Sequence, residues 1–430
     1  MKLLIKNGKI VNPSGVEKKD VLIDNSRIVK TAGSIEEKGC KVIDAEGKHL
    51  FPGLIDLHTH LRTPGREDKE TILSGSKSAV KGGFTAIQCM PNTQPAIDSY
   101  EVASSIKEEA ERIGLLDIFP VGALTKGRQG KELSEYGLLK EAGCLSLSDD
   151  GVSVKDSGLL RSAMEYSSNF GMLVISHCED RDLSLSGLIR ESAVSGIWGI
   201  DGIPEIAETV VVARNIELAK FLNIGIHLAH ISSGRSVELI RKAKQEGILV
   251  TAETCPHYLT FTLEDVVKNK FNANFKINPP LGTEEDRQAL IKGLKEGVID
   301  CISTDHAPHT FLEKEGTLYE SEFGVIGLEF AFSLTLDLVI KGSLPLKDLA
   351  LRMASMPAKI LGLSGRGEIK EGFRADLCIA DLEKEWEVAE SEIASKSKNT
   401  PLLGKKLKGK IEMTIYKGKT VYSVRESCRS

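Results

Sequence analysis

The sequence predicts an α/β fold in which a (β/α)8 barrel is joined to a small β-sandwich domain built from both chain termini. Two observations predict the barrel: eight short apolar runs lie between about residues 53 and 365, and stretches of helical period separate them. A third predicts the small domain, because short alternating runs occur at both chain ends. The expected boundaries are 1–52 and 366–430 for the small domain and 53–365 for the barrel.

Alternating apolar and polar residues at the two chain ends predict short antiparallel strands. Near the N-terminus, turns such as Asn-Gly and Pro-Ser-Gly separate the runs KLLIKNGKIV, DVLIDNSRIV and KVIDAEGKHLF. The same pattern returns in ADLCIADL and KIEMTIYKGKTVY near the C-terminus. We therefore expect the two ends to form one β domain together.

The central part of the chain alternates between predicted strands and helices. The strand candidates are 54–58, 84–90, 117–124, 144–149, 172–177, 224–230, 248–255 and 300–305. Clear helical patterns cover 99–114, 204–223 and 284–297, the last opening with acidic residues and closing on glycine. An open doubly wound sheet is the alternative fold, but no G-x-G-x-x-G follows any of the strands. The pattern therefore favours the barrel.

The charge and the apolar runs favour a small-molecule partner over nucleic acid or a membrane. The chain has 56 Lys and Arg against 61 Asp and Glu, a net charge of −5, and it has no strong basic cluster. No apolar run approaches the ~18 to 20 residues that span a bilayer, and the N-terminus does not resemble a signal peptide. We expect a cytoplasmic protein.

The cysteines predict neither a disulfide framework nor a cysteine zinc site. They are scattered through apolar contexts without C-x-x-C spacing. Most of the eight cysteines are therefore expected to be buried, reduced thiols.

Polar side chains that suit metal binding follow most of the predicted strands. In a parallel barrel the carboxyl ends of the strands form the active site. The residues at these ends are His58, His60, Asn92, Asp149, Asp150, His177, His230 and Asp305. Imidazole and carboxylate are the ligand set of hydrolytic zinc. The sequence therefore predicts a metal site at this end of the barrel.

The pair His58 and His60 is the clearest part of this pattern. Residues i and i+2 of a strand point the same way, so both imidazoles would face the barrel mouth. Taken alone, the pair could be incidental, and a single strand-terminal histidine is more often structural than a ligand. The shared position of all these residues favours ligands instead.

Several neighbouring residues have a structural interpretation. Asp149 fits a turn or helix cap, although spacing does not decide between it and Asp150. His227 would lie deeper in its strand than His230, in the core or behind a ligand, and His306 lies on the loop after the last strand. We also expect structural roles for His49 and His257.

The motifs resemble those of a known family. DLHTHLRTPG, MPNTQP, SDDG, HCED, LAHISS, NFKINPPLG, STDHAPHT and EFGVIGLE are similar to the motifs of bacterial dihydroorotases with an aspartate as bridging ligand, within the metal-dependent amidohydrolase superfamily. The similarity runs almost end to end and includes the β domain built from both termini.

The resemblance implies a set of functional residues. It implies His58, His60 and Asp305 around one Zn²⁺, His177 and His230 around a second, and Asp150 bridging them, with Asp305 also as the catalytic proton carrier. The implied substrate contacts are His60, Arg62, Asn92, Asn278, His309, Phe323 and Gly324. A surface salt bridge is the alternative for Arg62, and turn formation is the alternative for the two asparagines, which adjoin prolines.

The resemblance also implies an activity and partners. The reaction is the reversible cyclisation of N-carbamoyl-L-aspartate to L-dihydroorotate in pyrimidine (UMP) biosynthesis, by a hydrolase that acts on a cyclic C–N bond. A homodimer and a complex with aspartate transcarbamoylase are the implied assemblies.

Two other functions are alternatives. A non-catalytic scaffold partner of the transcarbamoylase would be marked by loss of ligands, and all six are present. ETCPHYL is also similar to allantoinases and hydantoinases, but those relatives usually bridge their metals with a carboxylated lysine, which CLSLSDDG lacks. Thr63 and Gly282 replace the family's usual Asp and Arg, so contacts near the substrate are expected to differ.

Overall fold

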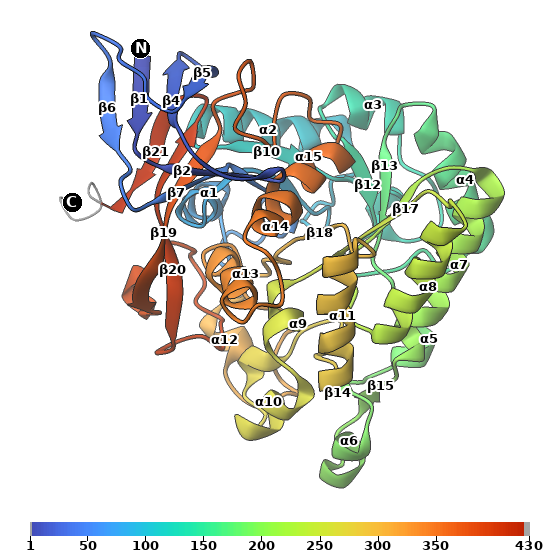
Figure 1. The fold of residues 1–430 in the computed structure, drawn as a ribbon. Coiled ribbons are helices and arrows are strands. Elements are labelled where there is room, and N and C mark those ends of the chain that lie inside the picture. The colour runs from blue at the N-terminus through green and yellow to red at the C-terminus, as the bar shows by residue number, and fades with distance from the viewer. Residues whose placement is uncertain (1, 425–430) are drawn as a thin grey trace.

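The computed structural model describes residues 2–424 and shows a parallel barrel beside a β-sandwich (Figure 1). The barrel strands are β8 (Leu54–Thr59), β9 (Phe84–Cys89), β10 (Asp117–Pro120), β11 (Gly122–Ala123), β12 (Ser146–Ser148), β13 (Leu173–Ser176), β16 (Ile226–Leu228), β17 (Val250–Thr254) and β18 (Cys301–Ile302). They pair in parallel, in the orders β8-β9-β10 and β11-β12-β13-β16-β17-β18. The predicted fold class is confirmed.

The last strand meets the first and closes the barrel. Thr59 and His306 form a parallel bridge, and the His60 backbone N–H donates to the His306 carbonyl at 2.8 Å. The third predicted strand is divided into β10, which ends at Pro120 and pairs with β9, and β11, which pairs with β12. Closure places the carboxyl ends of β8 and β18 side by side.

Helices surround the barrel (Figure 1). They are α1 (Ile72–Lys81), α2 (Tyr100–Ile113), α3 (Tyr136–Glu141), α4 (Ser157–Ser168), α7 (Ile206–Leu222), α8 (Gly234–Gln245), α9 (Pro256–Thr260), α10 (Leu263–Lys268), α11 (Glu284–Glu296), α12 (Phe311–Lys314), α13 (Ala331–Ile340), α14 (Lys347–Ala350) and α15 (Met356–Ile360). A π-helical turn, Leu351–Ser355, joins the last two. Within residues 2–424, no helix combines the length and apolar character needed to span a bilayer.

The three helices with the clearest sequence patterns are present. Ser99 caps the start of α2, and Gly114 ends it in the left-handed region at φ 69°. At α11, the Thr283 side chain and Asp286 form a capping box, and Gly297 ends the helix at φ 77°. Local capping chemistry therefore sets these helix ends.

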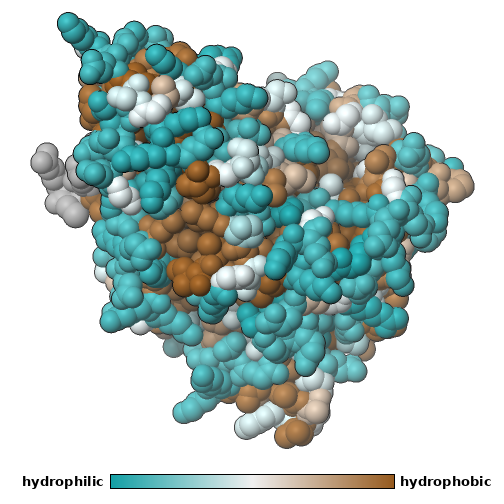
Figure 2. Space-filling view, in the orientation of Figure 1, coloured by the Kyte–Doolittle hydropathy of each residue, from teal (hydrophilic) through white to brown (hydrophobic). Residues whose placement is uncertain are grey.

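An excursion leaves the barrel between β13 and α7. It contains α5 (Arg181–Ser184), the strand pair β14 (Ile189–Arg190) and β15 (Gly202–Ile203), and α6 (Ala193–Trp198). Figure 1 shows α6 at the lower tip of the molecule. The same tip is apolar in Figure 2, where most of the visible face is hydrophilic, and Ile197 and Trp198 are 81% and 59% exposed.

Strands from both chain ends form the small domain. They are β1 (Lys2–Lys6), β2 (Lys9–Asn12), β3 (Gly15–Lys18), β4 (Asp20–Asp24), β5 (Arg27–Ala32), β6 (Lys41–Asp44), β7 (His49–Pro52), β19 (Leu377–Glu387), β20 (Lys406–Tyr416) and β21 (Lys419–Ser423). One sheet has the order β5-β4-β1-β6, and the other has β21-β20-β19-β7-β2-β3. Ile5, Ile23 and Leu377 belong to the buried cluster of this domain.

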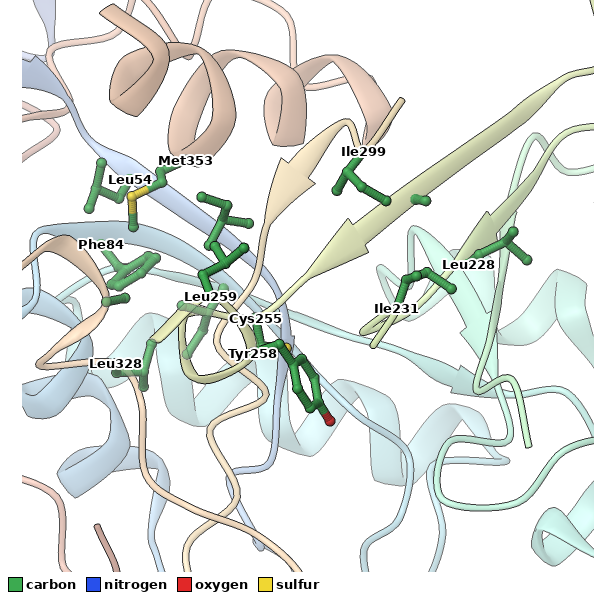
Figure 3. Packing of buried hydrophobic residues seen from close by; sticks show 14 of the residues in the cluster. Leu54, Phe84, Leu228, Ile231, Cys255, Tyr258, Leu259, Ile299, Leu328 and Met353 are labelled. Carbon is green, nitrogen blue, oxygen red and sulfur yellow. The ribbon is translucent and has the colours of Figure 1, made fainter. Parts of the chain in front are cut away.

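A larger apolar cluster fills the space between the barrel strands and their helices. Figure 3 shows Leu54 and Phe84 beside Met353, and Leu228 and Ile231 in another part of the same cluster. Burying one such side chain contributes about 1.5 to 3 kcal/mol. The described cysteines are free and, apart from partly exposed Cys40, buried as predicted; Cys428 lies outside the described residues.

A charged cluster joins the amino end of β10 to the small domain. Asp117 pairs with Arg366 and with Arg374 Nη2 at 2.7 Å, and its Oδ1 accepts from the Tyr416 hydroxyl at 2.6 Å. Burial raises the pKa of Asp117, but the two arginine charges outweigh it and lower the pKa well below its usual range. The carboxylate therefore stays charged in the folded protein.

We predict that Asp117→Asn destabilises the protein in a pH-dependent way. Because the folded-state pKa is depressed, the stabilising effect is present above the unfolded pKa of about 3.9 and is lost as the pH falls towards the folded value. Urea unfolding at pH 7 should show a loss of about 1.5 to 3 kcal/mol, shrinking below about pH 4. The control Asp337→Asn removes an exposed pair with Lys341; an equal effect of both variants would contradict the prediction.

Candidate metal and substrate site

The predicted ligand side chains converge at the carboxyl end of the barrel. They are His58 and His60 on and after β8, Asp150 after β12, His177 after β13, His230 after β16 and Asp305 after β18. All are buried, with at most 6% of the residue exposed. Strand ends that are far apart in the sequence therefore bring imidazoles and carboxylates to one place.

The Asp150 carboxylate lies at the centre of this group. Its Oδ1 is 3.2 Å from His58 Nε2, 3.7 Å from His177 Nδ1 and 3.6 Å from His230 Nε2. Its Oδ2 is 3.6 Å from His60 Nε2. One carboxylate thus reaches all four imidazoles.

Asp305 lies against the two histidines of the first strand. Its Oδ1 lies 3.0 Å from His60 Nε2 and 3.6 Å from His58 Nε2. Behind it, the buried Asp56 carboxylate accepts from the backbone N–H groups of His58 and Thr304, each at 3.1 Å. Asp56 therefore ties together the two strand ends that carry His58 and Asp305.

The backbone is strained where it delivers some of these side chains. His230 and Asp305 have φ of 37° and 46°, and Arg62 has φ of 60°. Left-handed conformations at residues other than glycine cost of order 1 kcal/mol or more and cluster at functional sites. The surrounding hydrogen bonds hold these conformations in place.

Polar groups behind the histidines orient three of the imidazoles. His58 Nδ1 lies 3.2 Å from Glu253, His60 Nδ1 lies 2.8 Å from Asn92 Oδ1, and His177 Nε2 lies 2.9 Å from Glu179. A neutral imidazole that donates through one nitrogen keeps a lone pair on the other. In each case the other nitrogen faces Asp150.

Glu253 anchors His58 from the barrel interior. This fully buried carboxylate also lies 3.2 Å from His227 Nε2 and accepts from the Ser303 hydroxyl. Burial raises the pKa of Glu253, but its contacts with His227 and His58 lower it well below the usual range. His227 therefore lies behind a predicted ligand, as its deeper strand position indicated.

The donor set fits a divalent metal. The ligand atoms of His58, His60 and Asp305 lie within 4.8 Å of one another, as do those of His58, Asp150 and His230. His58 Nε2 and Asp150 Oδ1 are buried and make no hydrogen bond. Buried polar atoms are normally paired, and a cation between these atoms would satisfy them.

Charge also favours a cation at this point. Burial raises the pKa of Asp150, but the charge of His58 outweighs it and lowers the pKa well below its usual range. Burial likewise raises the pKa of Asp305, yet the hydrogen bond to His60 and the charge of His58 lower it to about 2. The site therefore holds two ionised carboxylates away from water.

A cavity of about 240 Å³ opens above the cluster, lined by His60, Arg62, Asn92, Asp150, Gly151, His177, Arg181, His230, Asn278, Asp305, Ala307, His309, Glu322, Phe323 and Gly324. All of the predicted substrate contacts are in this set. Thr63 and Gly282 are not: Thr63 Oγ1 donates to the Glu70 carbonyl, and the Gly282 carbonyl accepts from Leu263. The departures therefore lie outside the cavity lining.

One wall of the cavity is cationic. Arg62 is half-buried and directs Nε to the Pro308 carbonyl at 3.1 Å, and Nη2 lies 3.2 Å from His309 Nε2. Lys69 Nζ lies 3.1 Å from His309 Nδ1. Burial and the charges of Arg62 and Lys69 lower the pKa of His309 to about 2. His309 is therefore neutral at pH 7, and its Nε2–H donates to the Phe323 carbonyl at 2.8 Å.

The loop that carries Phe323 and Gly324 is held by two polar side chains, the half-buried Lys314 and the buried Asn399. Lys314 Nζ donates to the Gly324 carbonyl at 3.0 Å, and Asn399 Nδ2 donates to the same carbonyl at 3.1 Å. Gly324 has φ of 136°, and a Cβ there would lie 2.7 Å from the Cβ of Ala307. Only glycine fits this approach of the loop to the wall.

The sequence pattern did not identify several of these residues. Glu179 is in the HCED motif and Glu253 is in ETCPHYL, but the sequence pattern assigns no functional role to either carboxylate. Lys69 and Asn399 carry no sequence signal. Asp149 accepts from the Thr125 backbone N–H at 3.0 Å and from its hydroxyl, so it points away from the metal ligand cluster.

Comparison with known proteins gives close relatives over the full chain. Residues 47–236 match the family described as Dihydro-orotase-like. The chain is 46% identical over 428 residues to a dihydroorotase of Trichlorobacter lovleyi, covering 99% of this chain and 100% of that protein. It is 49% identical over 422 residues to a dihydroorotase of Caldicellulosiruptor saccharolyticus, covering 97% of each.

The fold is similar to that of solved hydantoinases and dihydropyrimidinases. The L-hydantoinase (dihydropyrimidinase) from Arthrobacter aurescens superposes with a TM-score of 0.88 at 24% identity, covering 98% of this chain and 96% of that one. This likeness includes the barrel and the domain built from both termini.

We predict that the two adjacent aspartates differ in their effect on bound metal. Asp150→Ala removes the carboxylate that reaches four imidazoles, so elemental analysis should show a large loss of divalent metal. The matched variant Asp149→Asn loses charged hydrogen bonds to Thr125, which should lower stability by about 1.5 to 3 kcal/mol and leave the metal in place. Equal metal loss in both variants would contradict this.

Proposed function

The chain belongs to the dihydroorotase family and is a cyclic amidohydrolase, and from that premise we propose that its six convergent side chains hold two zinc ions beside the substrate. His58, His60 and Asp305 would bind one ion, His177 and His230 the second, and Asp150 both. The supporting observation is the central position of Asp150 among the imidazoles. Bound zinc would act as a Lewis acid that lowers the pKa of water towards about 7 and polarises a carbonyl group.

The residues of the cavity would bind dihydroorotate by its carboxylate. A guanidinium can donate two parallel hydrogen bonds to a carboxylate, and the half-buried Arg62 lies on the cavity wall. Asn92 accepts from His60 through Oδ1, which leaves its NH₂ group to donate. The Phe323–Gly324 backbone closes the same side of the cavity.

The Asp305 carboxylate would carry the proton. In hydrolysis, water adds to the ring carbonyl and the C–N bond breaks. Asp305 would accept the proton that the water loses and transfer it to the departing ring nitrogen. The reverse sequence gives the cyclisation of N-carbamoyl-L-aspartate.

The central aspartate also bears on the alternative functions. A carboxylated lysine would be expected at this position in an allantoinase or hydantoinase, and a scaffold protein would be expected to lack ligands. Asp150 and the complete ligand set support dihydroorotase chemistry at this site. The homodimer, the transcarbamoylase complex, the cytoplasmic location and the domain boundaries stay predictions.

The specificity test compares cyclic substrates. Purified protein should hydrolyse dihydroorotate and show little turnover of allantoin, hydantoin and dihydrouracil, because those three lack the carboxylate that Arg62 would bind. Chelation should abolish turnover and added Zn²⁺ should restore it. Faster hydrolysis of a substrate without a carboxylate, or full activity after chelation, would overturn the proposal.

We predict that Arg62→Met weakens substrate binding. The variant loses hydrogen bonds to a charged group worth about 1.5 to 3 kcal/mol, so the KM for dihydroorotate should rise about 10- to 150-fold with zinc content unchanged. Arg66→Met is the control, because Arg66 pairs with Asp68 and Glu313 and does not line the cavity. An unchanged KM in Arg62→Met would assign Arg62 to structure.

Asp305→Asn separates metal binding from proton transfer. Asparagine keeps the shape and one oxygen but cannot accept the proton. Zinc should therefore be largely retained while kcat falls about 10²- to 10⁴-fold. Loss of zinc in proportion to activity would make Asp305 chiefly a ligand, and near-full turnover would refute both roles.

A further inference from the structure

Glu179 contacts two groups of the site at once, although the proposed mechanism gives it no part. Its Oε2 lies 2.9 Å from His177 Nε2 and 3.0 Å from Asn278 Nδ2. Only 9% of the residue is exposed. We propose that Glu179 is a positioning residue that sets which nitrogen of His177 faces the metal and which end of the Asn278 amide faces the substrate. This inference rests on the proposed function.

The first consequence concerns His177. A carboxylate only accepts hydrogen bonds, so the proton of the neutral imidazole must lie on Nε2. The lone pair is then on Nδ1. Nδ1 is the atom that lies 2.8 Å from His230 Nε2 and 3.7 Å from Asp150 Oδ1. Glu179 therefore directs the lone pair of His177 towards the metal ligand cluster.

The second consequence concerns Asn278. Because Glu179 only accepts, the amide must turn its NH₂ group towards the carboxylate. The Asn278 carbonyl oxygen is then the end that remains for a ligand in the cavity. Asn278 thus offers a hydrogen-bond acceptor to the cavity. This acceptor favours a substrate whose ring carries an N–H donor.

The Asn92 amide has the opposite orientation to that of Asn278, and a hydrogen-bonding neighbour again fixes it. His60 donates to Asn92 Oδ1, so the NH₂ group of this amide is free to donate. The two asparagines of the cavity therefore differ: Asn92 offers a donor beside Arg62, and Asn278 offers an acceptor beside Glu179. A molecule with a carboxylate at one end and a ring N–H at the other matches this arrangement.

The local backbone supports a fixed position for Glu179. The Glu179 backbone N–H donates a hydrogen bond to the Ser153 hydroxyl at 3.0 Å. The next residue, Asp180, caps α5 by accepting from the Asp182 N–H at 2.9 Å. These bonds fix the backbone around Glu179, and its carboxylate lies between His177 and Asn278.

The metal part of the inference is tested without substrate. Glu179→Gln has the same shape but brings an NH₂ group against His177 or Asn278. Zn²⁺ titration of chelator-treated protein should show one of the two ions bound about 10- to 100-fold more weakly than in the wild type. The control Asp182→Asn, on the exposed side of α5, should bind both ions as the wild type does. Wild-type zinc affinity in Glu179→Gln would overturn the His177 part.

The substrate part is tested by a double-mutant cycle. With Zn²⁺ at a concentration that saturates every variant, so that the His177 effect is removed, Glu179→Gln and Asn278→Ala should each raise the KM for dihydroorotate. The double variant should raise it no further than the larger single effect, because Glu179 then acts through Asn278. KM effects that multiply would overturn this part. If Glu179→Gln does not fold, Asn278→Asp breaks the same contact from the other side and should raise KM similarly; an unchanged KM there would also overturn it.

Failure of the proposed function would give a different result from failure of the inference about Glu179. A wild-type protein that binds zinc but does not hydrolyse dihydroorotate would refute the function, while the zinc titration would still decide whether Glu179 orients His177.

Discussion

The Asp150 carboxylate, buried within 3.2 to 3.7 Å of four imidazole nitrogens, is the constraint on which the rest of the site depends. A buried charge is tolerated only when it is paired and hydrogen-bonded. The four histidines come from three strands, so the pairing exists only when the barrel is closed. The bridge between Thr59 and His306 and the two hydrogen bonds of Asp56 are therefore as important to the site as the ligands themselves.

The small domain takes part in holding the site. Asn399, which the expected boundary assigns to that domain, accepts from the His309 N–H at 3.1 Å and donates to the carbonyls of Ala307 and Gly324. Near it, the Glu70 carboxylate accepts from Ser395 and faces His306 at 3.3 Å. At the opposite end of the barrel, Asp117 binds two arginines of the same C-terminal region. The chain end therefore supports the barrel on both of its faces.

The charge of the cavity is divided in a way that suits its chemistry. Carboxylates gather beneath it, where cations would bind, and Arg62 and Lys69 lie on one wall, where an anionic group would bind. Burial and the same two cations keep His309 neutral by lowering its pKa to about 2. This neutrality gives His309 one donor and one acceptor, which Phe323 and Lys69 occupy.

The sequence by itself determined the repeated strand-and-helix order, the glycine that ends the helix at 284–297, and the polar residues that follow most of the barrel strands. These features depend on short-range periodicity and on capping chemistry, which are local properties of the chain. The domain assembled from both chain ends could also be predicted, because the alternating pattern occurs at each end. Convergence of the strand-terminal histidines and aspartates then follows from barrel geometry alone.

Only the tertiary structure decided which groups stand behind those residues. Spacing left Asp149 and Asp150 equivalent, and the structure separates them because Thr125, in the loop that follows β11, donates to Asp149. Glu253 and Asn399 become functional candidates through partners far away in the sequence, His58 and His309, and Glu179 through Asn278 as well as its sequence neighbour His177. Hydrogen bonds between buried side chains have no period in the sequence, because the partners meet only after the strands have closed into a barrel.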